Sequence, residues 1–180
     1  MPASVGRNIL QGGAGSSNTN DIDDAMLVKQ VVSGAQTGVD RAALDVALKL
    51  GLPCGGWVPR GRIDERGRIP DRYPNLKETP TADFSERTTA NVRDSDATLI
   101  VSHGRLTGGS LFTREEADRL GRPCLHLDLQ AVSSADAAEV ARAWLHENSI
   151  QVLNVAGPRA SKDPEAYPAS THLLGLILRP

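Results

Sequence analysis

Short, continuous apolar runs alternate along the chain with longer segments whose apolar residues recur at helical spacing. The apolar runs predict strands at residues 31–33, at the start of 52–61, and at 97–102, 124–129 and 150–157. Helical spacing and terminal residues predict helices at residues 37–50, 83–94, 113–121 and 135–148, and a last helix that begins at residue 163 or 168. Continuous apolar strands between helices are typical of a parallel sheet covered on both faces. The pattern therefore predicts an α/β fold, a single-domain, doubly wound (Rossmann-like) parallel sheet of about five strands with helices on both faces.

The stretch from Val31 to Gly51 carries the clearest local signal: a strand, a turn with a glycine at each end, and a helix. Thr37 and Asp40 have the spacing of a capping box, in which each side chain serves the other's free amide. Such a turn points unpaired amides and the positive end of a helix at one spot, which suits a phosphate or another anion. The same residues also fit a first βα unit with a purely structural role. The glycines match neither G-x-G-x-x-G nor G-x-x-x-x-G-K-[ST], so the ligand stays open.

A second glycine loop, residues 104–113, follows the predicted strand at 97–102 and again leads into a helix. Thr113 and Glu116 have the spacing of a second capping box. In doubly wound sheets, ligands bind beyond the carboxyl ends of the strands, where the strand order reverses. With the first strand and the strand at 97–102 as neighbours, the turn at 34–40 and this loop would face each other across a crevice.

Two segments differ in composition from the predicted domain. Residues 1–25 are rich in Gly, Ser and Asn, which is typical of a flexible extension, so the ligand-binding domain is expected to span residues 26–180. A long irregular segment that ends near Thr81 carries several arginines, among them Arg60. Loops of this length inside compact domains are usually functional or mobile. Its arginines either clamp an anionic ligand or solvate the surface.

Composition narrows the classes of function. The chain has 180 residues, of which 3% are aromatic, and a formal net charge of -2. These values argue against a broad nucleic-acid surface. Cys54 and Cys124 match no metal-ligand spacing and are typical of buried thiols in a reducing compartment. Since no apolar run is long enough to span a membrane and no signal-peptide core is present, a cytoplasmic location is expected.

The residue pattern contains no strong catalytic signature. The histidines are scattered without metal-ligand spacing, and His103, at the end of a predicted strand, is the one expected to reach the crevice. The carboxylates of Asp40, Glu115 and Glu116 each have a structural explanation at the start of a helix. Binding and catalysis both remain open on this evidence.

Several ordered blocks of sequence resemble the molybdenum carrier family, which includes the algal molybdenum cofactor carrier proteins. The blocks are SGAQTGVDRAALDVAL, GGWVPRGR, IPDRYP, ERTTANVRDSDATLIVS, TGGS and NVAGPR. The resemblance extends from about Lys29 to Leu178 and implies a Rossmann-like fold related to the LOG, or lysine-decarboxylase-like, group. It also implies a carrier, not an enzyme, that stores and protects the molybdenum cofactor (molybdopterin). The implied assembly is a homo-oligomer, a dimer or tetramer, that serves enzymes of cofactor synthesis or cofactor acceptors.

The expected site joins both glycine loops to the turn after the last strand. Backbone amides and arginines there suit a phosphate or molybdate-like anion, so the carried ligand would be held without a protein-bound metal. The expected ligand-binding residues are Ser33, Gly34, Gln36, Thr37, Gly38, Asp40, Arg60, His103, Thr107, Gly108, Gly109, Ser110, Thr113, Gly157 and Arg159.

Two alternatives accompany the carrier hypothesis. The first is a LOG-like nucleoside 5′-monophosphate phosphoribohydrolase, whose catalytic residues would be Arg114, Glu115 and Glu116. Thr107 stands where the LOG motif has a proline, which weakens the assignment of LOG catalytic roles to these residues. The second is a sensor that binds a nucleotide such as ADP-ribose through the same loops.

Overall fold

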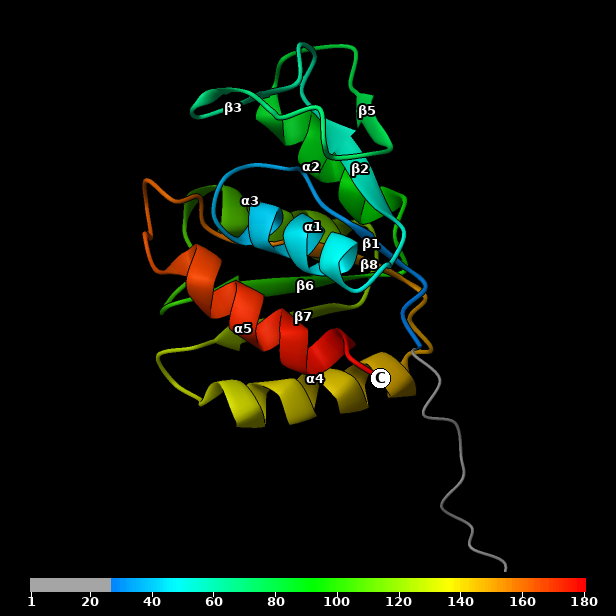
Figure 1. Cartoon of the computed structure of the whole chain (residues 1–180), viewed down its shortest axis with the longest axis vertical. Helices are drawn as coiled ribbons and strands as arrows, with labels where there is room; N and C mark the ends of the chain where they lie inside the picture. Colours follow the sequence, from blue (N-terminus) through cyan, green and yellow to red (C-terminus); the bar gives the residue numbers. More distant parts are fainter. Residues whose placement is uncertain (1–26) are drawn as a thin grey trace, which may run out of the picture.

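The computed structural model describes residues 27–180 and shows one layered α/β domain (Figure 1). The predicted extension at residues 1–25 lies outside the described residues. The elements, in chain order, are β1 (Gln30–Val32), α1 (Val39–Lys49), β2 (Cys54–Val58), β3 (Ile63–Asp64), β4 (Gly67–Arg68), β5 (Leu76–Glu78), α2 (Phe84–Arg93), β6 (Ala97–Ser102), α3 (Gly108–Arg119), β7 (Cys124–Asp128), α4 (Ser134–Glu147), β8 (Val152–Ala156) and α5 (Ala166–Leu178).

The main sheet is parallel, which confirms the predicted fold class. Its six strands follow the order β5-β2-β1-β8-β6-β7. The prediction of about five strands omitted the edge strand β5, which pairs Lys77 with Trp57 of β2. Because β5 is short and mostly exposed, it leaves no apolar run in the sequence. A small antiparallel hairpin, β3–β4, fills part of the irregular segment that follows β2.

The last strand, β8, lies in the centre of the sheet between β1 and β6. Its register pairs Leu153 with Val31 on one side and Val155 with Leu99 on the other. The first strand and the strand at 97–102 are therefore not neighbours, and that expectation was wrong. The segment after β8 is instead inserted between the two glycine loops.

Helices cover both faces of the sheet, as predicted (Figure 1). Helices α1, α5 and α4 pack side by side on one face, and α2 packs with α3 on the other. The core between the layers contains the fully buried side chains of Leu44, Leu99, Leu153 and Leu173. Burying each such side chain contributes about 1.5–3 kcal/mol, so the layers are held mainly by this apolar contact.

Helix α1 begins at Val39, with Gly38 as its N-cap and no side-chain cap, so the predicted capping box is wrong. The hydroxyl of Thr37 donates to Glu65 on the β3–β4 hairpin, and Asp40 accepts from the Gln36 amide and from an arginine of α2. Gly38 has φ 79°, a backbone conformation that favours glycine. Tertiary partners have thus replaced the local cap.

Helix α3 begins at Gly108, five residues before Thr113, where the second capping box predicted its start. Thr113 lies inside the helix, where its hydroxyl donates to the carbonyl of Gly109 at 2.8 Å. Glu116 accepts from Arg119 at 2.7 Å and from Thr89 at 2.7 Å. These side chains are occupied within and between helices, so they cannot cap.

The C-terminal helix α5 begins at Ala166, between the two predicted starts. The Asp163 side chain accepts from the Glu165 amide at 3.1 Å. Pro168 lies in the first turn, where its missing N–H would have no helical partner. No helix among residues 27–180 is long and apolar enough to cross a membrane.

Candidate functional site

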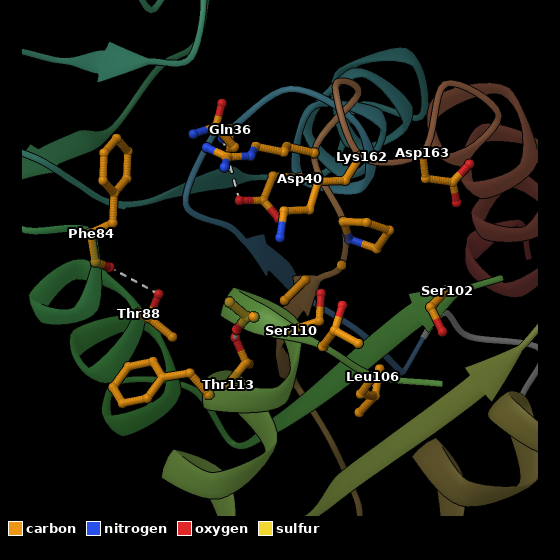
Figure 2. A pocket seen from close by; sticks show the side chains of 18 of the residues that line it. Gln36, Asp40, Phe84, Thr88, Ser102, Leu106, Ser110, Thr113, Lys162 and Asp163 are labelled. Atoms are coloured by element: carbon orange, nitrogen blue, oxygen red, sulfur yellow. Dashed lines mark hydrogen bonds between the residues drawn. The ribbon is translucent and has the colours of Figure 1, made fainter. Parts of the chain in front are cut away.

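One cleft of about 790 Å³ opens at the carboxyl ends of β6 and β8, beside the first turns of α1, α2 and α3. Its volume lies in the usual range for small-molecule sites, about 300–1,000 Å³. Figure 2 shows Asp40 and Ser110 between Phe84, on one side, and Asp163, on the other. The lining residues are Gln36, Asp40, Phe84, Ser85, Arg87, Thr88, Ser102, His103, Arg105, Leu106, Thr107, Gly108, Gly109, Ser110, Phe112, Thr113, Gln130, Ala156, Gly157, Pro158, Arg159, Lys162 and Asp163.

The start of α3 supplies hydrogen-bond donors to this cleft. Its N-cap, Thr107, makes no side-chain cap, and the amides of Gly108, Gly109 and Ser110 have no hydrogen-bond partner within the described chain. Gly109 has open space where a Cβ would stand. The ammonium nitrogen of Lys162 would lie 3.2 Å from a Cβ at Gly108, so a cation stands beside the same helix end. Free amides, a helix N-terminus and a cation together favour an anion.

Two arginines add positive charge to the rim. Arg105 is exposed and forms no ion pair among residues 27–180. Arg159 is half-exposed, and its Nε lies 3.5 Å from a carboxylate oxygen of Glu65. This loose pairing leaves the guanidinium of Arg159 able to turn toward a ligand in the cleft.

His103 and Asp163 form a hydrogen-bonded pair in the wall of the cleft. The His103 Nδ1 lies 2.7 Å from Asp163 Oδ2, and both side chains are largely buried. A carboxylate on one imidazole nitrogen fixes the ring orientation and leaves Nε2 for another partner. The pair therefore presents an oriented imidazole edge at the end of β6.

Asp40 is the buried acid of the cleft, with 3% of its surface exposed. Its Oδ2 accepts from Arg87 Nη1 at 3.1 Å and from the Gln36 amide at 3.3 Å. Burial raises the pKa of the Asp40 carboxyl, and the charge of Arg87 opposes that rise. The Arg87 guanidinium lies across Gly34, in the space where any larger residue would place its Cβ.

Ten of the fifteen predicted ligand-binding residues line the cleft. They are Gln36, Asp40, His103, Thr107, Gly108, Gly109, Ser110, Thr113, Gly157 and Arg159.

The other five lie elsewhere, mostly because the protein itself occupies them. The Ser33 hydroxyl donates to the carbonyl of Val155 at 2.8 Å, and Gly34 is covered by Arg87 of α2. Thr37 bonds to Glu65, and Gly38 caps α1 against the turn after β8. Arg60 reaches the carbonyl of Pro80 at 3.4 Å, away from the cleft. The first glycine turn therefore offers fewer free amides than its sequence suggested.

Several lining residues were missed by sequence reasoning. Phe84 and Arg87 come from the first turn of α2, which contains no glycine and follows the long irregular segment. Lys162 and Asp163 lie in the turn before α5. The segment ERTTANV belongs to one of the blocks that carry the family resemblance and includes Arg87. It was the sequence signal that could have pointed to this residue.

The described residues contain no group of three or more His, Cys, Asp or Glu side chains that could hold a metal ion. Both cysteines are free, Cys54 buried and Cys124 half-buried. Burial raises the pKa of the Cys124 thiol to about 11, so this sulfur is a poor metal ligand at neutral pH.

Comparison with known proteins gives two matches. The family model of the circularly permutated YpsA SLOG family matches residues 31–178. A crystal structure from Syntrophus aciditrophicus SB, described as "Putative molybdenum carrier protein", is 53% identical, with a TM-score of 0.83 over 84% of this chain and 96% of that chain. No curated protein matches the chain. These matches confirm the resemblance found in the sequence: the chain belongs to the circularly permutated YpsA SLOG family and is a relative of that molybdenum carrier protein.

Proposed function

We propose that the chain is a carrier that binds the molybdenum cofactor, or a related molybdenum species, in this cleft. The observation that carries the proposal is the open N-terminus of α3, whose free amides share the cleft with Lys162, Arg105 and Arg159. Such donors bind phosphate and oxo groups through charge-assisted hydrogen bonds. The name of the 53% identical relative supports molybdenum as part of the cargo.

The donor set of the cleft fits a cargo that brings its own metal ligands. The molybdenum cofactor holds its metal through dithiolene sulfurs and oxo groups, and its phosphate is the natural partner of free amides. With no cluster of metal-binding side chains among residues 27–180, the protein would contact the cofactor's phosphate and ring rather than its metal. Enclosure in the cleft would limit access of water and oxygen to the cofactor.

The hydrolase alternative has less support. Arg114 pairs with Asp118 at 3.3 Å, and Glu116 is held by Arg119 and by a threonine of α2. Neither these residues nor Glu115 line the cleft. The hydrogen bond from Arg119 lowers the pKa of Glu116, which opposes a role as general acid.

Anaerobic titration of the full chain with molybdenum cofactor tests the proposal. We expect saturable binding, measured as molybdenum that co-elutes with the protein, and slower oxidation of the bound cofactor. The variant Arg105→Ala with Lys162→Ala should weaken binding about tenfold or more, because hydrogen bonds to charged groups contribute about 1.5–3 kcal/mol each. Lys49→Ala removes one positive charge at the opposite end of α1, away from the cleft, and should bind normally.

Absence of a saturable complex would refute the carrier proposal. Equal weakening by the Lys49 control would show that binding reflects only general charge. Release of ribose 5-phosphate from AMP in the same preparation would establish the hydrolase, and tight binding of ADP-ribose alone would establish the sensor.

A further inference from the structure

The Asp40 carboxylate has one oxygen that the protein leaves without a donor. Its Oδ2 is occupied by Arg87 and by the Gln36 amide, while Oδ1 has no hydrogen-bond partner within residues 27–180. The side chain is 4% exposed, and it lines the cleft. Oδ1 is not one of the fully buried side-chain atoms that lack a partner, so it is reached from the cleft and can accept a hydrogen bond from a ligand there.

The Gln36 side chain stands beside Asp40 and presents the opposite group. Its Oε1 accepts from the amides of Thr37 and Glu65, both at 3.0 Å, which fixes the orientation of the side-chain amide. Nε2 is consequently a donor with no partner in the described part of the chain, on a residue that is 7% exposed. Figure 2 shows Gln36 and Asp40 next to each other over the cleft. One acceptor and one donor thus lie together at the start of α1, Asp40 in its first turn and Gln36 just before it.

An aromatic wall lies on the same side of the cleft. Phe84, in the first turn of α2, is 40% exposed, and the Arg87 guanidinium lies 5.9 Å from its ring centroid. Phe112 of α3 also lines the cleft, so both phenylalanines of the chain take part in it. In Figure 2, Phe84 and Lys162 lie apart, with Asp40 between them. An exposed ring in a cleft suits stacking with a flat heterocycle.

We propose that Asp40, Gln36 and Phe84 form a subsite for the amino-oxo pyrimidine edge that guanine and pterins share. The inference rests on the proposed ligand cleft and specifies the ring end of its cargo. The ring N–H and the exocyclic amino group of this edge are adjacent donors that both point at Asp40 Oδ1, the oxygen with two free lone pairs. The neighbouring carbonyl accepts from Gln36 Nε2, and the ring stacks on Phe84. The anionic end of the ligand then extends toward Lys162 and the amides of α3.

Adenine is the informative comparison because it lacks this double donor. It offers one amino donor beside an acceptor nitrogen, so it satisfies the carboxylate with one hydrogen bond instead of two. A lost hydrogen bond to a charged group corresponds to a decrease in affinity of about tenfold or more. The test therefore measures, by calorimetry on the full chain, the dissociation constants of GMP, AMP and pterin-6-carboxylate.

We expect GMP to bind about tenfold more tightly than AMP, with pterin-6-carboxylate also bound and its fluorescence quenched. Asp40→Asn should remove the preference for GMP. Phe84→Leu should weaken all three ligands by a similar factor, about fivefold or more, because stacking is insensitive to the edge of the base. Leu111→Ala, an exposed apolar residue of α3 outside the cleft lining, is the control and should change nothing.

Equal binding of GMP and AMP, or a preference that survives in Asp40→Asn, would overturn the subsite. The wild-type ratio and Phe84→Leu keep the test valid even if Asp40→Asn fails to fold. The ratio of GMP to pterin-6-carboxylate affinity identifies which heterocycle the site prefers. A preference for GMP over AMP without molybdenum cofactor binding would refute the carrier proposal but not this subsite. Binding of the molybdenum cofactor with equal affinity for GMP and AMP would refute the subsite but not the carrier proposal.

Discussion

Gly34→Ala should destabilise the protein only while Arg87 is present. A Cβ on residue 34 would lie 1.6 Å from Arg87 Nη1 and 2.4 Å from its Cζ. Carbon and nitrogen atoms without a bond need about 3.5 Å, so the guanidinium would have to move by about 2 Å. That movement breaks its 3.1 Å ion pair with Asp40. Gly34 itself has no positive φ, so the alanine backbone is otherwise unstrained.

The magnitude follows from the burial of the pair. The side chains of Arg87 and Asp40 are 14% and 4% exposed, and removing one partner of a buried pair costs about 3–5 kcal/mol. Because the cleft admits water to Asp40, we expect about 2 kcal/mol for Arg87→Ala. In Gly34→Ala, reduced freedom of the unfolded chain returns about 0.4–1 kcal/mol, which leaves a net loss of about 1–2 kcal/mol.

The assay is a double-mutant cycle by urea denaturation near pH 7. In the Arg87→Ala background, Gly34→Ala should be neutral or stabilising, since the side chain that it displaces is absent. The coupling energy should be about 1.5–2 kcal/mol. Gly175→Ala, in α5, has no close neighbour and is the matched control, which should have the same effect in both backgrounds. Equal costs of Gly34→Ala with and without Arg87, within about 0.5 kcal/mol, would refute the reasoning.

Two further predictions concern pH. The pKa of Asp40 is raised in the folded protein, so the contribution of this group to stability is present below the unfolded value of 3.8 and is lost as pH rises through the folded pKa. Because the charge of Arg87 opposes that rise, Arg87→Ala should raise the folded pKa further, and its cost in urea denaturation should grow as pH increases from the acid range toward neutral. A cost that stays constant with pH would contradict this. Burial alone would raise the pKa of Glu65, but hydrogen bonds from Ser161 and Thr37 lower it below 4.5, so its stabilising contribution is present at neutral pH and is lost on acidification. Glu65→Gln should therefore cost about 1 kcal/mol at neutral pH and less near pH 3, and should speed proteolysis of the β3–β4 hairpin, whereas Glu115→Gln, on the exposed face of α3, should do neither.

The sheet could be predicted because its central strands carry their information locally. Residues 97–102 are mostly apolar, and every one of them is buried in β6. Strand β5 has no such pattern, since Lys77 and Glu78 are exposed and polar and join the sheet beside β2. The predicted number of strands was therefore one too low, because the sequence of this edge strand has no apolar pattern.

The two capping boxes failed for a different reason, which also limits prediction of the site. Thr37 has the right spacing for a cap, but its hydroxyl bonds to Glu65, 28 residues away. Arg87 likewise reaches Asp40 across 47 residues. Contacts between such distant residues depend on the packing of α2 and of the hairpin against the start of α1. Local spacing contains no information about such contacts. The ion pair of Arg87 with Asp40 in the cleft could therefore not be predicted from the sequence.

The central position of β8 explains how these distant segments meet in one cleft. Its carboxyl end, Gly157, passes so close to β6 and α1 that a Cβ there would lie 2.3 Å from the Val101 carbonyl oxygen and 2.4 Å from Val39 Cγ2. Glycine is the residue that permits this approach, because any side chain would push β8 away from its neighbours. The turn after Gly157 then brings Arg159 and Lys162 between the two glycine loops. The first glycine turn is thereby filled by the protein's own groups, while α3 keeps its amides free, so the free amides of the cleft lie at the second loop rather than the first.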